Sequence, residues 1–276
     1  MARSLNRGVL GVVGLLSLLL ANAAFAQPTA QSPAVLPHSA RLDEAANNPD
    51  NRVLADLLFS PADADEARAS LDWLGGRFQR GDSALIAFLY ARMLASFANT
   101  GPVPADQANE LKSTALAAFL YASAASMVDG LQCADGTARA NRTEQFAAQL
   151  STSGLMQLDE AARRKAAWVA VMIEQKTWPA RRTRNDARFQ CALGMAAMSA
   201  GLAAGQAKER APRPGEIGRQ VSVTPPADFV YQRRPDSQWW QEAEKVRAQL
   251  PAVTAKLAAI ERIPTDEEMD LLLSAE

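Results

Sequence analysis

The sequence predicts an all-α protein, an antiparallel helical bundle of about six to eight helices with a proline-rich irregular segment before a C-terminal helix. Three observations support this prediction. Apolar residues recur at helical spacing through residues 51–205, alanine is abundant, and short breaks with Gly, Pro, Asp or Ser separate the periodic segments. Such short connections place neighbouring helices antiparallel to one another.

The helices are expected in the following order. A short helix over 51–59 precedes Ser60-Pro61, where Ser is a favoured N-cap and Pro suits the first helical position, so a second helix runs from there to about Arg80. Gly81-Asp82 and then TGPVP (100–104) turn the chain at the next two connections. The remaining helices of this region are expected at 83–98, 105–128, 138–150, 159–177 and 186–205.

The pentapeptide AFLYA occurs at 87–91 and again at 118–122. Its spacing of 31 residues is close to the period of helical repeats, but such repeats contain two helices per period, and here the copies lie in successive helices. We therefore expect the two segments to pack against one another. The aromatic residues expected to meet are Phe88 or Tyr90 on one helix and Phe119 or Tyr121 on the other.

The N-terminal region predicts export. Arg3 and Arg7 precede an apolar run, VLGVVGLLSLLLA (9–21), and Ala24-Phe25-Ala26 places small residues before a cleavage point. We expect a signal peptide over 1–26 that is cleaved after Ala26, which would leave a soluble periplasmic or secreted protein. No later segment looks apolar for long enough to span a membrane. The 23 arginines against 6 lysines suggest a bacterium with a GC-rich genome, which favours the periplasm.

Composition divides the rest of the chain. Residues 27–50 are rich in Pro, Ser, Ala and Asn and are expected to form a flexible leader before the helical core domain of 51–205. Residues 206–236 are expected to form a Pro/Gly-rich linker or covering loop, and 237–276 a C-terminal helix and acidic tail. Pro251 should kink or split that helix.

Net charge excludes one class of partner. After removal of Arg3 and Arg7, 27 basic residues remain against 30 acidic ones. Proteins that bind nucleic acid usually carry a strongly basic face, so we expect no nucleic-acid partner.

The two cysteines, Cys133 and Cys191, are expected to form a disulfide, because the count is even and the expected compartment is oxidising. No CxxC pair indicates a redox site. The only histidine, His38, lies in the expected leader, so two sulfurs would lack further ligands for zinc. We expect a structural cross-link, no metal and no cofactor.

Histidine-based catalysis is excluded on the same ground, and the common nucleophile, phosphate-loop and HExxH motifs are absent from the sequence. Glu174 is the weak catalytic candidate that remains. It follows the apolar run 166–173, and a carboxyl among Trp168, Val171 and Trp178 could acquire the raised pKa that a glycan-cleaving general acid requires. The alternative is a solvent-facing Glu174 paired with Lys176 or Arg181.

Arginines gather in the segment WPARRTRNDARFQC (178–191). Guanidinium groups suit carboxylates and phosphates, so they suggest an anionic envelope ligand such as peptidoglycan stems or lipid head groups. The alternative is a solvated helix-entry loop whose arginines pair with Asp186 and nearby acids. The weak ligand-binding candidates are Arg181, Arg182, Arg184 and Arg188, joined by Arg139 and Arg142 if the disulfide forms.

Two function classes follow. The first is an exported helical binding or interaction protein, such as an immunity-type inhibitor, an envelope accessory factor or a small-ligand carrier, whose partner would be another envelope protein or an anionic envelope ligand. The second is a carboxylate-dependent hydrolase or lyase that acts on an envelope glycan. The absence of histidine-based motifs from the sequence and the bundle-like pattern favour the first.

Overall fold

A computed structural model describes most of the chain, in the ranges 36–48, 51–101, 103–184, 187–210 and 220–274. The expected signal peptide and its cleavage point lie outside these residues. The chain divides into two compact units, Met1–Pro37 and His38–Glu276, and the description that follows concerns the second. The domain boundaries expected after residues 50, 205 and 236 all lie inside that second unit.

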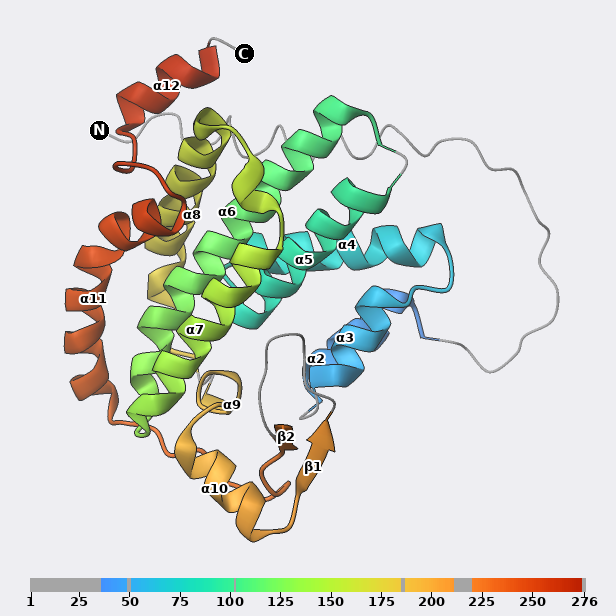
Figure 1. Cartoon of the computed structure of the whole chain (residues 1–276), viewed down its shortest axis with the longest axis vertical. Helices are drawn as coiled ribbons and strands as arrows, with labels where there is room; N and C mark the ends of the chain where they lie inside the picture. Colours follow the sequence, from blue (N-terminus) through green and yellow to red (C-terminus); the bar gives the residue numbers. More distant parts are fainter. Residues whose placement is uncertain (1–35, 49–50, 102, 185–186, 211–219, 275–276) are drawn as a thin grey trace, which may run out of the picture. The chain divides into compact units, whose positions relative to one another are not determined.

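The second unit confirms the all-α fold (Figure 1). Its described residues form eleven α-helices, more than the six to eight expected, because one helix lies in the expected leader, residues 187–203 form two helices, and the expected acidic tail forms a helix of its own. The helices are α2 (His38–Ala46), α3 (Asn51–Phe59), α4 (Ala64–Gln79), α5 (Ala84–Thr100), α6 (Ala105–Asp129), α7 (Gly136–Thr152), α8 (Glu160–Arg181), α9 (Ala187–Gln190), α10 (Met195–Ala203), α11 (Asp236–Leu257) and α12 (Asp266–Ser274). Two 3₁₀ helices, η2 (Gly130–Gln132) and η3 (Leu155–Gln157), and two strands, β1 (Ala207–Arg210) and β2 (Gln220–Val223), complete the described elements.

Helix α6 is the central helix of the fold and packs against α5, α7, α8 and α11. Residues 115–126 are buried without exception. By length and composition the segment Ala105–Gln132 could cross a membrane, and 89% of its most apolar window is buried inside the protein. The expectation that no later segment is apolar for long enough is therefore wrong. Burial among the other helices accounts for the apolar composition of α6.

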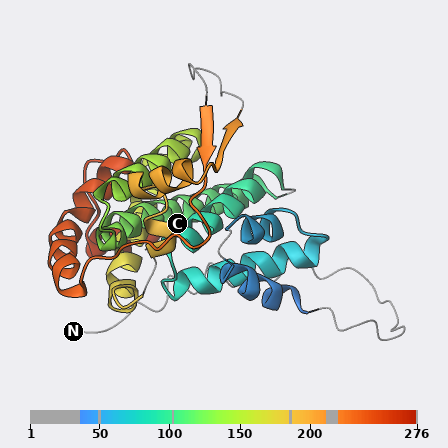
Figure 2. The same ribbon diagram turned by 90° about the horizontal axis from the view of Figure 1, so that it is seen from below.

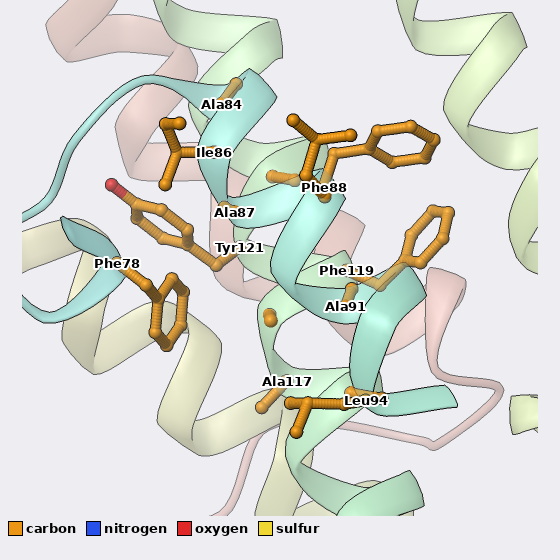
Figure 3. Packing of buried hydrophobic residues seen from close by; sticks show 14 of the residues in the cluster. Phe78, Ala84, Ile86, Ala87, Phe88, Ala91, Leu94, Ala117, Phe119 and Tyr121 are labelled. Atoms are coloured by element: carbon orange, nitrogen blue, oxygen red, sulfur yellow. The ribbon is translucent and has the colours of Figure 1, made fainter. Parts of the chain in front are cut away.

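The two AFLYA segments pack against one another, as expected. The rings of Phe88 on α5 and Phe119 on α6 meet edge to face with centroids 5.5 Å apart (Figure 3). Phe146 of α7 joins them, 5.0 Å from Phe88. Since only residues 101–104 connect α5 to α6, the two helices run antiparallel.

Side-chain caps fix where several helices begin. Asp63 accepts a hydrogen bond from the backbone N–H of Glu66 at 2.8 Å, so α4 begins three residues later than Ser60-Pro61 indicates. Asp159 caps α8 in the same way, through the N–H of Ala162 at 2.8 Å. In both cases the carboxylate satisfies an N–H group that has no partner within the helix.

Helix α2 corrects the expectation of a flexible leader over 27–50. Its Leu42 is fully buried against the neighbouring helices. The His38 ring lies 2.7 Å from the hydroxyl of Ser70, and Asp43 accepts a hydrogen bond from Arg77 at 2.8 Å. These contacts join α2 to α4, so a segment of polar composition becomes part of the folded unit.

The helix expected over 186–205 is broken between α9 and α10. Gly194 lies so close to Asp135 that a Cβ at this position would be 2.4 Å from a carboxylate oxygen. The backbone N–H groups of Met195 and Ala196 donate to Thr137 and Asp135, at 2.9 and 2.8 Å. Side chains from the start of α7 therefore cap α10 and impose a new helix start.

Residues 206–236 contain a short antiparallel hairpin that the sequence did not predict. Strand β1 pairs with β2 in the register Ala207↔Val223, and Figure 2 shows the two strands side by side. Beyond the hairpin the chain runs past η2, where the N–H of Ala134 donates to Gln232 and the N–H of Arg234 donates to Gln132. The expected irregular segment is thus held on the helical unit by backbone hydrogen bonds.

Helix α11 packs along α6 and α8 (Figure 1). Its Trp239 is buried, with its ring centroid 5.7 Å from that of Trp178 on α8. Leu250 is buried in the same cluster. The helix continues through Pro251 to Leu257, so the proline does not split it.

Candidate functional site

Glu174, the weak catalytic candidate, belongs to a buried group of charges that we call the ionic centre: Asp129, Glu174, Arg181 and Arg247. Arg181 donates from one Nη to Asp129 and from the other to Glu174, both at 2.6 Å. Arg247 of α11 adds a hydrogen bond from Nε to Glu174 at 3.1 Å. Asp129, Glu174 and Arg181 are 4%, 2% and 3% exposed. The ionic centre therefore joins α6, α8 and α11.

Two further polar groups line the ionic centre. The hydroxyls of Tyr121 and Thr177 lie 3.1 Å apart, and Arg181 Nε donates to Thr177 at 3.3 Å. Burial raises the pKa of Tyr121. Burial also raises the pKa of Asp129, against the opposing effect of Arg181. For Arg181 burial acts in the lowering direction, but Asp129 and its other neighbours raise the pKa overall, so the guanidinium stays charged.

This geometry answers both interpretations of Glu174. The carboxylate does not face solvent, although it is paired with Arg181 as the second interpretation held. Trp168, which was expected beside it, instead donates to Asp266 at 3.0 Å. A general acid must reach its substrate, and a carboxylate that is buried and bonded to two guanidinium groups has no such access. In this structure Glu174 is a buried ion-pair partner of Arg181 and Arg247.

The arginines of residues 181–188 do not form one patch. Arg182 stacks over Trp240, with its guanidinium carbon 5.4 Å from the ring centroid. Arg184 donates to the carbonyl of Gly81 at 2.8 Å and to Asp82 at 3.1 Å. Arg188 is exposed. Arg181, in the ionic centre, is out of reach of any external partner. Asp186, the partner proposed for these arginines, lies outside the described residues.

The two arginines that follow Cys133, Arg139 and Arg142, both lie on α7. Arg142 is 6% exposed, with its guanidinium carbon 3.9 Å from the ring centroid of Phe189 and one Nη donating to the carbonyl of that residue. Arg139 is half-buried, and its side chain lies against Gly130. The guanidinium group of Arg142 is therefore used inside the fold and is not presented to a ligand in the way the sequence suggested.

The disulfide between Cys133 and Cys191 is present, with Cα atoms 5.5 Å apart and both residues buried. Ala138 and Tyr231 pack beside it. The bond joins the end of α6 to the turn after α9 and is structural. Within the described part of the chain, no group of three His, Cys, Asp or Glu side chains could hold a metal ion.

A pocket of about 450 Å³ lies between α5 and α7, and we call it the α5–α7 pocket. The small side chains of Ala91 and Ala95 leave room on α5, and Phe119 and Leu155 are its deeply buried apolar members (Figure 3 shows Ala91 beside Phe119). The lining residues are Ala91, Arg92, Ala95, Ser96, Asn99, Phe119, Gln149, Thr152, Ser153 and Leu155.

The polar lining of this pocket has spare hydrogen-bonding capacity. Arg92, Ser96, Asn99 and Gln149 make no side-chain hydrogen bond or ion pair with any residue that the structure describes. The described lining contains no carboxylate, so Arg92 gives it one positive charge. The pocket opens to the surface, and an apolar wall with a few polar groups that have no partner among the described residues is typical of a small-molecule site.

These residues were not predicted from the sequence, because each is an ordinary polar residue in a helix. A signal was present: Arg92, Ser96 and Asn99 stand at positions i, i+4 and i+7 of an otherwise apolar helix, which places them on one face. The contribution of Gln149 could not be foreseen, because it depends on how α7 packs against α5.

Searches among known protein families, curated proteins and solved structures found no match to this chain. Evidence on function therefore comes from the geometry of the α5–α7 pocket, and the ionic centre bears only on the catalytic candidate Glu174.

Proposed function

We propose that this chain is an exported, soluble periplasmic binding protein without catalytic activity, an accessory protein of the cell envelope, and that the α5–α7 pocket holds its ligand. One observation carries the proposal. Four polar side chains that have no partner among the described residues line a single pocket from two helices. A ligand with matching groups would satisfy hydrogen-bonding capacity that the fold itself does not use.

Two further observations support export. The disulfide is consistent with an oxidising compartment, where such bonds persist. The N-terminal sequence has the order of charged, apolar and small residues that is typical of a signal peptide.

The alternative function, a carboxylate-dependent hydrolase or lyase, gains no support from its candidate acid. Glu174 and a second buried carboxylate, Asp129, are bridged by Arg181 in the interior. The α5–α7 pocket has no acid in its described lining that could protonate a glycosidic oxygen.

The test combines localisation with binding. The protein is expressed with its own N-terminal sequence, and the periplasmic fraction is expected to contain a chain that begins at Gln27. Saturation-transfer NMR with a digest of peptidoglycan, a mixture of sugars and short peptides, is expected to show bound components. Ala95→Phe fills the pocket and should remove these signals, whereas Ala196→Phe, at an exposed alanine of α10, should leave them unchanged.

Three results would overturn the proposal. The first is a chain retained in the cytoplasm. The second is an equal set of NMR signals from the wild type and Ala95→Phe. The third is turnover of the digest that Glu174→Gln abolishes without loss of fold, which would establish the hydrolase instead.

A further inference from the structure

Arg92 is held in place without being neutralised. Its guanidinium carbon lies 4.8 Å from the ring centroid of Phe59 and 5.8 Å from that of Phe88. Such stacking uses the flat faces of the guanidinium group, while its N–H groups point along its edge. Arg92 has no carboxylate partner among the described residues, so its donors remain available to an anion.

A carboxylate is the group that this edge fits best. The planar fork of a guanidinium group bonds the two oxygens of a carboxylate in parallel, and the bonds are charge-assisted. With no acidic residue in the described lining, nothing in the pocket repels such a ligand.

The other groups of the pocket indicate what should be attached to the carboxylate. Asn99 on α5 and Gln149 on α7 each offer an amide that both donates and accepts, which matches the C=O and N–H of a peptide bond. Thr152 and Ser153 already donate to backbone carbonyls of α7. Phe119 and Leu155 provide apolar contact for a small side chain.

We propose that the α5–α7 pocket binds the free carboxylate end of a short peptide, with Arg92 bonding the carboxylate and Asn99 and Gln149 bonding the adjacent peptide group. This inference rests on the proposed function, since it names the class of ligand for the same pocket. The volume of about 450 Å³ lies within the usual range of small-molecule sites and limits the ligand to a few residues.

The experiment uses a matched pair of probes, N-acetyl-Ala-Ala with a free carboxylate and the same peptide as its C-terminal amide. Both are titrated into the ¹⁵N-labelled mature protein and followed by NMR. We expect the carboxylate form to bind at least about ten-fold more tightly than the amide, because only it forms the charge-assisted pair. The perturbed resonances should be those of the C-terminal halves of α5 and α7.

Substitutions assign the effect. Arg92→Gln should remove the difference between the two probes, and Arg92→Lys should restore part of it because the charge returns without the fork. Asn99→Ala and Gln149→Ala should weaken both probes alike. Arg182→Gln is the control: this arginine also stacks on an aromatic ring, Trp240, but lies outside the pocket, so the preference for the carboxylate should persist.

The possible failures are distinguishable. Equal binding of the two probes, or a carboxylate preference that survives Arg92→Gln, would overturn the role of Arg92. Acetate binding as tightly as the peptide would show a site for simple anions and overturn the peptide part. If neither probe binds while the peptidoglycan digest does, this ligand class is wrong and the binding function stands. If the digest also fails to bind, both proposals fall.

Discussion

Two arginines in this molecule, Arg181 and Arg92, occupy opposite environments. Arg181 is buried at the end of α8 and bridges two carboxylates, each at 2.6 Å. Arg92 is exposed on α5, stacks on two phenylalanine rings and has no acid partner among the described residues. The first charge is neutralised within the fold, and the second is left for solvent or a ligand.

The difference shows that an arginine neutralised by neighbouring acids serves the fold, whereas an arginine without such a partner is available for binding. Removing an ion from water costs several kcal/mol, so a buried guanidinium group must have its acids beside it to be tolerated. An exposed guanidinium group keeps its hydration and needs no partner. A stacked, unpaired arginine in a pocket is therefore available for binding, whereas the arginine that is closest to other charges is not.

The largest expected effect comes from the ionic centre. Arg181→Met leaves Asp129 without its cation and Glu174 with only Arg247, both in the interior. We expect the free energy of unfolding to fall by about 3–5 kcal/mol, the usual result of removing one partner of a buried pair. Urea denaturation at neutral pH measures this change. Arg182→Met is the control, since that side chain is exposed, and should cost about 1 kcal/mol or less.

A triple substitution tests whether charge is the cause. If Arg181→Met is combined with Asp129→Asn and Glu174→Gln, no uncompensated carboxylate remains in the centre, and part of the lost stability should return. A single Arg181→Met variant as stable as the control, or a triple variant less stable than the single one, would contradict the assignment.

The next effect comes from the disulfide, which lies at the same end of α6 as Asp129. The bond closes a loop with a sequence separation of 58 residues. Replacing both cysteines with Ala should lower the free energy of unfolding by about 2–4 kcal/mol. Because Arg92 lies far from the bond in sequence and contacts neither cysteine, binding of the carboxylate probe to the folded variant should be unchanged. A variant that stays folded but no longer binds the probe would contradict this prediction and would show that the disulfide affects the α5–α7 pocket.

The sequence was sufficient for the parts of the fold that local patterns determine. The periodicity of α5 and α6 predicted their pairing, and the contact of Phe88 with Phe119 confirms it. Composition was misleading where tertiary contacts prevail. Part of the polar leader forms helix α2, because Leu42 is buried in the core and Asp43 accepts a hydrogen bond from Arg77. Arg77 is 34 residues away in the sequence, so no local pattern reveals this contact.

The candidate site was harder to predict for the same reason. Glu174 after an apolar run looked unusual, but its partner Arg247 is 73 residues away, on a helix whose docking no local pattern reveals. Arg92 looked ordinary in the sequence. What distinguishes it is that no acidic residue stands beside it in the described lining of the pocket, and the sequence does not show this. A sequence shows which charges exist, and only the packing shows which of them are neutralised.

A smaller effect on stability is expected at the pocket. Arg92→Gln removes stacking on Phe59 and Phe88 at an exposed site, which is worth about 0.5–1 kcal/mol. The free energy of unfolding should therefore change by no more than about 1 kcal/mol, even though the carboxylate preference of the pocket is lost. Thermal unfolding, read beside the NMR titration, measures both. A large loss of stability would place Arg92 with Arg181 as a structural residue.

The smallest effect concerns a third kind of arginine, Arg262, which is exposed and paired with Glu268 on α12. A hydrogen bond from Arg262 and one from the N–H of Thr265 lower the pKa of Glu268 from 4.5 to about 2. A carboxyl with a lowered folded pKa contributes stability that is present above pH 4.5 and is lost as the pH falls toward 2. Asp129 acts in the opposite direction, because its raised pKa means that the folded chain holds its proton more tightly than the unfolded chain does.

Between pH 4.5 and 2 we therefore expect α12 to open first, seen as faster amide hydrogen exchange in α12 than in α6 after correction for intrinsic rates. Glu268→Gln should make the exchange of α12 insensitive to pH in this range, and high salt at neutral pH should partly reproduce the acid effect, because solvent screens an exposed pair and not a buried one. If α6 opened before α12 on acidification, the distinction between neutralised interior charge and weakly held surface charge would not describe this protein.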